Sequence, residues 1–164
     1  MLARDKVLAL PALLRVLRAA RAGGRRIVFT NGCFDLLHAG HVQLLERARA
    51  EGGFLVVGVN SDRSVRALKG PPRPIVSQRD RMLVLAGLAS VDAVIVFDDP
   101  TPARLIARIQ PDVLVKGADW ETGEIVGRAT VERHGGRVVR VPLVRGQSTS
   151  SLVDRIVSVA RRGG

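Results

Sequence analysis

The alternation of short apolar runs with helical patterns constrains this chain more than any other feature. From Arg26 onward, five β-branched runs are almost continuously apolar, which is typical of strands buried on both faces of a parallel sheet. The expected strands are 27–30, 54–60, 93–97, 113–116 and 137–141, and the expected helices between them include 42–50, 79–89 and 102–109. The chain is therefore predicted to be an α/β protein with three αβα layers and a parallel five-stranded sheet ordered 3-2-1-4-5.

Local signals mark where several helices begin and end. Ser77, with Asp80 three residues later, resembles a capping box, and Thr101 before Pro102 predicts an N-cap followed by proline at the first helical position. The opening segment has leucines on one side and arginines on the other, and two glycines follow it at 23–24. It is predicted to be an amphipathic helix that packs on the core.

The length of 164 residues fits one domain, 1–164, with a helical extension over 1–24 and a core over 26–160. No apolar run approaches the ~18 residues that a membrane span needs, and charged residues interrupt the N-terminus. We therefore expect no membrane segment and a cytoplasmic protein. The proline-rich stretch at 69–74 is expected to be a loop within the domain.

The chain is strongly basic, with 26 Lys and Arg against 15 Asp and Glu and a net charge of +11. Such a balance raises nucleic acid or another polyanion as a partner. The arginines are scattered, however, aromatic residues make up only 3%, and tyrosine is absent, so no stacking platform for bases is indicated. Nucleic acid is the weaker reading, and a small phosphorylated substrate would also use positive potential.

The segment TNGCFDLLHAGH, residues 30–41, lies where the first strand ends and a helix begins. Ligands of open α/β sheets bind at this place, outside the carboxyl ends of the strands. His38 and His41 are three residues apart and can share one face of the turn that enters the helix. Together with the free N–H groups of a helix N-terminus, they form a pattern suited to phosphate.

Other uses of this segment were weighed against phosphate binding. A metal site would need more ligands, and only Asp35, Cys33 and the distant His134 are available, so no protein-held metal is expected. Cys33 as a covalent nucleophile is weaker still, because nothing in the sequence indicates a lowered thiol pKa. Asp35 is expected to orient or cap the histidine turn.

A second segment, GQSTSSLVDRI at 146–156, places Ser148, Thr149 and Ser150 before another helix. Their hydroxyls and the free N–H groups of that helix suit the β and γ phosphates of a nucleotide. A serine and threonine cluster alone is usually only a helix cap. Two phosphate-type helix starts in one small α/β chain form a much more specific pattern.

These two blocks resemble the HxGH motif and the late Ser-Thr-rich motif of the cytidylyltransferase-like nucleotidyltransferase superfamily. Within it, the chain is most similar to bacterial heptose 1-phosphate adenylyltransferases, a domain often fused behind a sugar kinase. The similarity runs from about 27 to 156 and includes FTNGCFDLLHAGH, VNSDRSVRALKGPPRPI, RMLVLAGLASVDAVIVF, PDVLVKGADW and GQSTSS. It implies a Rossmann-like fold and transfer of AMP from ATP to a heptose 1-phosphate, which gives ADP-heptose and pyrophosphate.

The resemblance also implies roles for individual residues. His38, His41 and Lys69 would be catalytic, with the histidines at the α-phosphate and Lys69 on the triphosphate or sugar phosphate. The implied nucleotide- and phosphate-binding residues are Asn31, Gly32, Cys33, Phe34, Arg81, Gly117, Asp119, Ser148, Thr149, Ser150 and Arg155. Mg²⁺ is expected to enter with ATP, held mainly by substrate and water. The expected partners are ATP, a sugar 1-phosphate, a separate sugar kinase and phosphatase upstream, and a second copy in a homodimer.

Three alternatives stay open. The same chemistry could serve glycerol 3-phosphate as a cytidylyltransferase or FMN as an FAD-forming adenylyltransferase, and a protein of another class would be a basic nucleic-acid-binding or regulatory module. Glycerol phosphate cytidylyltransferases carry an arginine two residues before the glycine of the Ser-Thr motif. Val144 stands at that position here and Arg145 is one place off, which favours ATP over CTP.

Overall fold

The structure, a computed structural model, describes residues 1–117, 125–142 and 148–162. Its strands are β1 (Arg26–Gly32), β2 (Gly53–Asn60), β3 (Ala93–Phe97), β4 (Val113–Gly117) and β5 (Arg137–Val141). Its helices are α1 (Leu10–Ala22), α2 (Ala39–Ala50), α3 (Asp62–Lys69), α4 (Gln78–Ala86), α5 (Ala103–Ile109), α6 (Arg128–Arg133) and α7 (Thr149–Arg162), and a 3₁₀ turn covers Ala3–Lys6. No helix in these ranges is long and apolar enough to cross a membrane.

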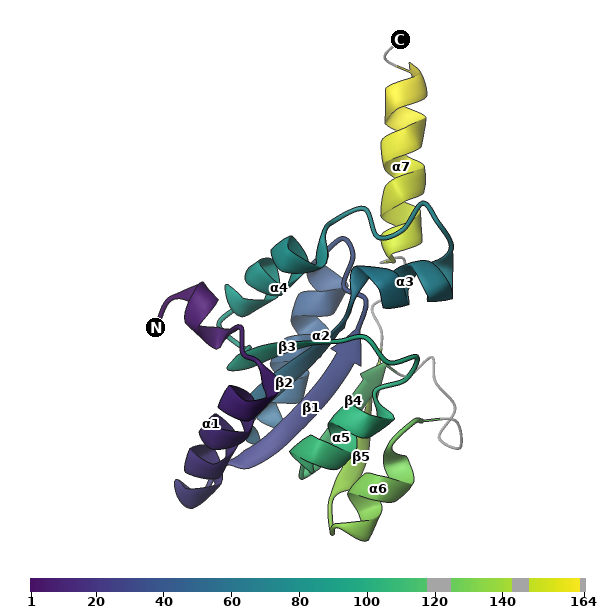
Figure 1. Ribbon diagram of the computed structural model, residues 1–164. Helices are drawn as coiled ribbons and strands as arrows, with labels where there is room; N and C mark the ends of the chain where they lie inside the picture. Colours follow the sequence, from purple (N-terminus) through teal and green to yellow (C-terminus); the bar gives the residue numbers. More distant parts are fainter. Residues whose placement is uncertain (118–124, 143–147, 163–164) are drawn as a thin grey trace.

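The five strands form one parallel sheet in the order β3-β2-β1-β4-β5 (Figure 1). This confirms the predicted strand order. The chain steps from β1 outward to β2 and β3, and then crosses to β4 on the other side of β1. The strand order therefore reverses between β1 and β4, which is where a ligand site is expected in such a sheet.

Helices cover both faces of the sheet and bury two apolar layers (Figure 1). On one face, Leu13 and Leu17 of α1 and Ile106 of α5 pack against β1, β2 and β4. On the other face, Leu45 of α2 and Leu85 of α4 pack against the alternate residues of the same strands. All five of these side chains are fully or almost fully buried, which explains why the strands are apolar on both faces.

Two short helices were not anticipated from the sequence. In α3, Ser61 accepts a hydrogen bond from the backbone N–H of Ser64 at 3.0 Å and thereby caps the helix, but only two residues of the helix are buried. In α6 only Val131 is buried, so neither helix carries a broad apolar stripe. One consequence concerns Lys69, which was expected in a loop but is the last residue of α3.

The capping predictions had different outcomes. Ser77 caps α4, because its hydroxyl accepts the N–H of Asp80, as predicted. The prediction at Thr101 was wrong. Pro102 itself occupies the cap position, its carbonyl accepts the N–H of Ile106 at 2.9 Å, and no side chain caps the helix. The first helical residue is therefore one position later than expected.

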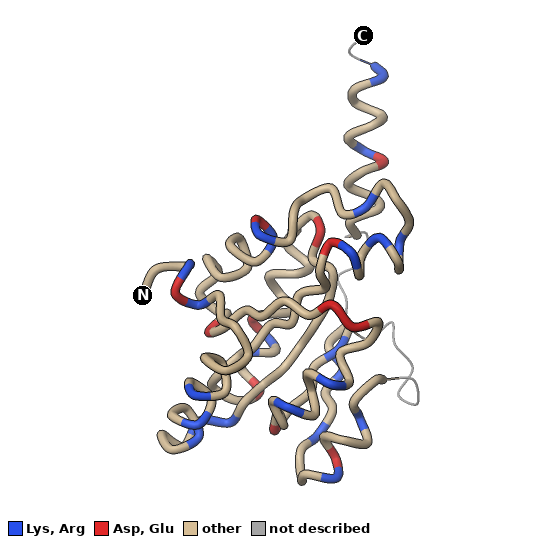
Figure 2. Tube along the Cα trace, viewed as in Figure 1, with Lys and Arg blue, Asp and Glu red and all other residues tan. Residues whose placement is uncertain are grey.

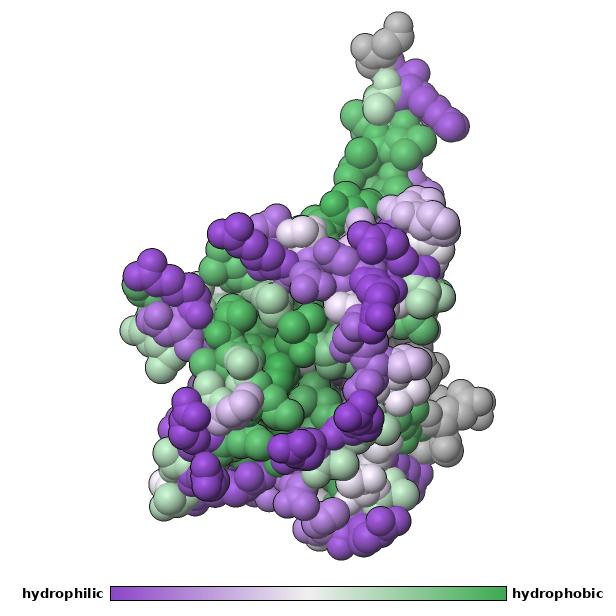
Figure 3. Space-filling view, in the orientation of Figure 1, coloured by the Kyte–Doolittle hydropathy of each residue, from purple (hydrophilic) through white to green (hydrophobic). Residues whose placement is uncertain are grey.

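The last helix, α7, projects from the rest of the molecule (Figure 1). None of its residues is buried, and Ile156 and Val159 are 61% and 69% exposed. The helix nevertheless begins at the end of the sheet toward which the β1 arrow points, as a phosphate-binding turn requires. Apart from α7, an apolar area lies in the middle of the face seen in Figure 3.

Candidate active site

The first predicted motif lies at the carboxyl end of β1, beside the end of β4. β1 extends through Asn31 and Gly32, two residues farther than expected, and Phe34 follows with a positive φ of 48°. The Phe34 ring is 4% exposed and packs under Gly32, where a Cβ would lie 3.2 Å from it. The Phe34 side chain therefore packs beneath the turn. The sequence had predicted that it binds the nucleotide.

The two histidines form a pair at the start of α2. His38 occupies the N-cap position with an extended backbone, and the rings of His38 and His41 stack with centroids 3.9 Å apart and an interplanar angle of 29°. Phe34 supports the His41 ring at a centroid distance of 5.3 Å. Neither Nδ1 atom finds a hydrogen-bond partner among the described residues. The first turn of α2 begins at this pair, and the N–H of His41 donates to the carbonyl of His38 at 2.9 Å.

Burial keeps both rings neutral. It lowers the pKa of His38, and it lowers the pKa of His41 to about 4, with further lowering by His38 and Lys69. A neutral imidazole has one N–H donor, so each ring can donate to a phosphate oxygen without carrying a charge. An anion bound beside the rings would favour their protonated form and raise both pKa values.

Lys69, the last residue of α3, is close enough to this turn for its positive charge to act on the side chains there. Its charge lowers the pKa of His41 and opposes the raised pKa of Cys33. The Cys33 pKa is raised mainly by burial, so this side chain is a neutral thiol at neutral pH. Figure 2 shows basic residues gathered along α3, so the helix brings positive charge to this end of the sheet.

Arg81 is placed differently from its predicted role at phosphate. It is 1% exposed, and its guanidinium donates to the carbonyl of Val76 at 3.0 Å, the carbonyl of Asn60 at 2.9 Å and the carboxylate of Asp62 at 2.8 Å. It also donates to the carbonyl of Cys33. A buried guanidinium with four such acceptors is not presented to a ligand, and Arg81 instead joins the loops that follow β1 and β2.

Lys116 was missed by the sequence analysis. It is the penultimate residue of β4, half-buried, and its ammonium group donates to Oδ1 of Asn31 at the end of β1. It therefore lies where the strand order reverses, between the two central strands. A lysine at the end of an otherwise apolar strand is the signal that could have found it. Its position beside Asn31 adds a second cation to the site.

The second predicted motif is separated from the first in the structure. The hydroxyl of Ser148 accepts the N–H of Ser151 at 3.0 Å and caps α7, and Thr149 and Ser150 occupy its first turn. Arg155 is exposed farther along the helix. No described contact joins these residues to His38 or His41. Gly117 ends β4 at the site, while Asp119 and Val144 lie outside the described residues.

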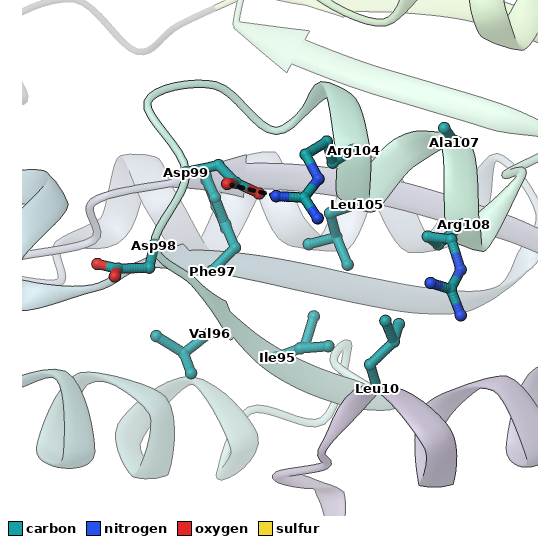
Figure 4. Close-up of a pocket in the computed structure, with 10 residues that line it drawn as sticks. All are labelled: Leu10, Ile95, Val96, Phe97, Asp98, Asp99, Arg104, Leu105, Ala107 and Arg108. Carbon is teal, nitrogen blue, oxygen red and sulfur yellow. Dashed lines mark hydrogen bonds and ion pairs between the residues drawn. The ribbon is translucent and has the colours of Figure 1, made fainter.

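A hollow of about 530 Å³ lies on the α1 and α5 side of β3 (Figure 4). Leu10, Ile95 and Leu105 supply apolar walls, and an ion pair of 3.3 Å between Asp99 and Arg104 lies at its edge (Figure 4). None of the predicted site residues lines it. The hollow therefore does not belong to the histidine site.

A family model described as cytidylyltransferase-like matches residues 29–151. The matched range includes the histidine turn at 38–41 and the Ser-Thr turn at 148–150. The chain belongs to the cytidylyltransferase-like family. Curated relatives of this family member include the bifunctional protein HldE of Methylobacillus flagellatus, 54% identical over 94% of this chain and 32% of the relative. The HldE of Alkalilimnicola ehrlichii is 55% identical over 93% of this chain and 32% of the relative. The chain thus spans about a third of the length of these relatives.

Solved structures agree with the cytidylyltransferase-like fold. A lipopolysaccharide core biosynthesis protein from Thermoplasma volcanium is 27% identical, with a TM-score of 0.62, over 76% of this chain and 100% of that chain. A pantoate-beta-alanine ligase from Francisella tularensis has a TM-score of 0.55 over 80% of this chain and 65% of that chain. At 14% identity, the second likeness concerns the fold alone.

Proposed function

We propose that this chain transfers AMP from ATP to a heptose 1-phosphate and releases pyrophosphate. The observation that carries the proposal is the stacked, neutral pair His38 and His41 at a helix N-terminus, beside the strand reversal and within reach of the Lys69 charge. Membership of the cytidylyltransferase-like family supports the reaction class. The heptose 1-phosphate rests on the sequence resemblance, and the identity to HldE over almost the whole chain supports it.

The reaction requires one displacement at phosphorus. An oxygen of the sugar 1-phosphate forms a bond to the α-phosphorus of ATP, and the bond from that phosphorus to the bridging oxygen of the β-phosphate breaks. The attacking oxygen is already ionised at neutral pH, so no general base is needed. The products are ADP-heptose and pyrophosphate, and no covalent enzyme intermediate forms.

The residues contribute mainly position and charge. The ring N–H donors of His38 and His41, at the positive end of the α2 dipole, would hold the α-phosphate oxygens as negative charge builds on them. Lys69 would neutralise charge on the leaving pyrophosphate or on the acceptor phosphate. Lys116, next to Asn31, would add positive potential from the floor of the site. The hydroxyls of Thr149 and Ser150 would take the outer phosphates.

We propose that a magnesium ion enters with the triphosphate. The described residues contain no cluster of three His, Cys, Asp or Glu side chains that could hold a metal. The carboxylates near the turn are also engaged, Asp35 by backbone N–H groups and Asp62 by Arg81. These residues do not fit a protein-held ion, so phosphate oxygens and water would have to bind it.

The partners follow from the same proposal. A kinase and a phosphatase would act before this enzyme to supply the sugar 1-phosphate, and the reaction would take place in the cytoplasm. The relatives are named bifunctional and are about three times as long as this chain. Both facts support a second activity that acts together with nucleotidyl transfer, in the same polypeptide or in the same pathway. A homodimer would be the functional assembly.

The test is a pyrophosphate-release screen with product identification by mass spectrometry. ATP, CTP, GTP and UTP are each combined with heptose 1-phosphates of both anomers, glycerol 3-phosphate and FMN. We expect turnover with ATP and one heptose 1-phosphate anomer. Turnover only with CTP and glycerol 3-phosphate, or with ATP and FMN, would replace the proposed substrate. Salt-dependent binding of DNA or RNA without any pyrophosphate release would replace the reaction class.

A further inference from the structure

Residues 70–76 connect α3 to α4 without regular structure and contain three prolines, which have no N–H to donate. Gly70 donates its N–H to the carbonyl of Arg66 at 2.9 Å as the cap of α3, so the backbone donors that remain in the segment are those of Arg73, Ile75 and Val76. Arg73 donates to the carbonyl three residues earlier at 3.1 Å. Ile75 and Val76 both donate to Oδ1 of Asp35, at 2.8 and 2.9 Å. Two of the three available N–H groups of this segment therefore end on one carboxylate.

Asp35 also holds the segment by charge. Its Oδ2 lies 2.9 Å from Nη1 of Arg73, and the two side chains are only 1% and 15% exposed. A buried carboxylate is costly unless it is paired and hydrogen-bonded; here Oδ1 accepts two N–H groups, while Oδ2 is paired with Arg73 by charge without a hydrogen bond. The described hydrogen bonds and ion pair of Asp35 go to residues 73–76, and none of them reaches the turn at 38–41, where Asp35 was expected to act.

This contact joins the two parts of the site that carry its chemistry. Asp35 lies three residues before His38, and residue 70 follows Lys69 directly. Gly70 ends α3 with a φ of 91°, so the direction of the chain after Lys69 is set by the segment that Asp35 holds. The start of α3 is held by the ion pair of 2.8 Å between Asp62 and Arg81, whose guanidinium also donates to the carbonyl of Val76 at 3.0 Å. Releasing Asp35 would therefore free the Lys69 end of α3 and the residues after it, while Val76 and the start of α3 stay held by Arg81.

We propose that Asp35 is a positioning residue that latches residues 73–76 and thereby holds Lys69 over the reacting phosphates. The proposal rests on the proposed nucleotidyl transfer, to which it adds how the lysine is placed. The two N–H contacts fix Ile75 and Val76 on the carboxylate, and the buried ion pair adds the attraction of Arg73. A displacement of about 1 Å in a positioned group can cost a reaction ~10²-fold.

The first test is a double-mutant cycle with Asp35→Asn, Lys69→Ala and the combined variant. Asparagine keeps the shape and one acceptor oxygen but removes the charge opposite Arg73. We expect Asp35→Asn to lower kcat/KM by about 10- to 100-fold. The changes in kcat and in KM should stand in the same proportion as those caused by Lys69→Ala. In the Lys69→Ala background, Asp35→Asn should cost less than about threefold. If the loss of kcat/KM in the combined variant equals the product of the two single losses, Asp35 does not act through Lys69.

The second test needs no substrate. Trypsin can cut after Lys69 only when the Lys69–Gly70 bond leaves the end of α3, and mass spectrometry identifies that cut. Asp35→Asn should speed this cleavage at least about fivefold, because local opening governs proteolysis. The matched control is Asp99→Asn, which removes an exposed ion pair with Arg104 in α5, away from α3, and should leave cleavage at Lys69 unchanged.

These readouts separate the latch from the reaction. Cleavage at the wild-type rate in Asp35→Asn, with an unchanged melting temperature, would overturn the latch even if nucleotidyl transfer is found. Absence of nucleotidyl transfer in the wild-type protein would overturn the proposed function, while faster cleavage would still support the structural latch. Arg73→Met, which removes the other partner, should reproduce the faster cleavage at Lys69, and its failure to do so would also count against the latch.

Discussion

The turn at His38–His41 is built into the centre of the fold, whereas the turn at Ser148–Ser150 begins a helix that stands clear of it. The first turn has a buried ring beneath it, two stacked rings within it, and the loops around it joined by the buried Arg81. In the second, the hydroxyl that caps the helix is the main described contact, and α7 has no buried residue.

The difference suggests a division of work between the turns. The rings of the histidine turn are already stacked and supported without substrate, so the turn should act on the transition state with little further ordering. The Ser-Thr turn has few contacts of its own, so the nucleotide would supply its partners. We therefore expect changes in the first turn to act on kcat and changes in the second to act on nucleotide affinity.

The largest expected effect is from the histidines. His38→Ala and His41→Ala should each lower kcat by at least about 10²-fold, since a lost transition-state donor costs ~2.7–4 kcal/mol. His134→Ala is the matched control, because this exposed histidine bonds only to Thr130 and Gln110 away from the site. Steady-state kinetics measure the effect, and circular dichroism checks the fold. Near-normal turnover in either site variant would remove the histidines from the mechanism.

The next effect tests the second turn. Thr149→Val with Ser150→Ala should raise KM for ATP about tenfold or more and change kcat less, because a hydrogen bond to a charged group contributes ~1.5–3 kcal/mol. Ser158→Ala lies farther along α7, where its hydroxyl donates to the carbonyl of Arg155, and should change neither constant. A loss confined to kcat would show that both turns act on the transition state.

A smaller effect concerns protonation of the first turn. Burial holds the pKa of His41 at about 4, so NMR titration of the free protein should give a midpoint near that value. A non-hydrolysable ATP analogue should raise the midpoint, because the triphosphate favours the imidazolium form. A midpoint near 6.5 in the free protein would contradict the buried geometry.

The same shift has a consequence for stability. The unfolded chain binds a proton on this histidine below pH about 6.5, while the folded chain resists it until pH about 4. The free energy of unfolding should therefore fall as pH is lowered through that window. His41→Gln should reduce the fall in urea titrations at pH 7, 6 and 5, and an unchanged fall in that variant would contradict the assignment.

The smallest effect is expected on α7. Ile156→Ala should change the free energy of unfolding by no more than about 0.5 kcal/mol, because the side chain is 61% exposed. Leu45→Ala, on the fully buried face of α2, should lower the free energy of unfolding by about 2–5 kcal/mol. Urea denaturation measures both. A loss above about 1 kcal/mol for Ile156→Ala would show that another surface covers α7 in solution.

Much of the fold could be predicted because its signals are local. Five apolar runs marked the strands, and the phosphate-type turn after the first run marked the site. The short helices α3 and α6 were missed because they bury too few residues to leave a periodic pattern. A helix that is mostly exposed, such as α3, is distinguished from a loop chiefly by its cap at Ser61.

The charged residues of the site were harder to place. Arg81 has the same sequence signal whether it binds phosphate or carbonyl oxygens, and only the fold brings four acceptors from distant loops around it. The partners of Asp35 lie 38–41 residues away along the chain. Lys116 gained its significance only when β4 was placed beside β1. Long-range contacts of this kind leave no periodic trace.

The most direct test of the account is the nucleotide preference with one acceptor. kcat/KM is measured for ATP and for CTP with the heptose 1-phosphate anomer that supports turnover. The account predicts a preference for ATP of at least about 10²-fold, because Val144 stands in the sequence where glycerol phosphate cytidylyltransferases carry an arginine. Equal values, or a preference for CTP, would contradict it and make the chain a cytidylyltransferase.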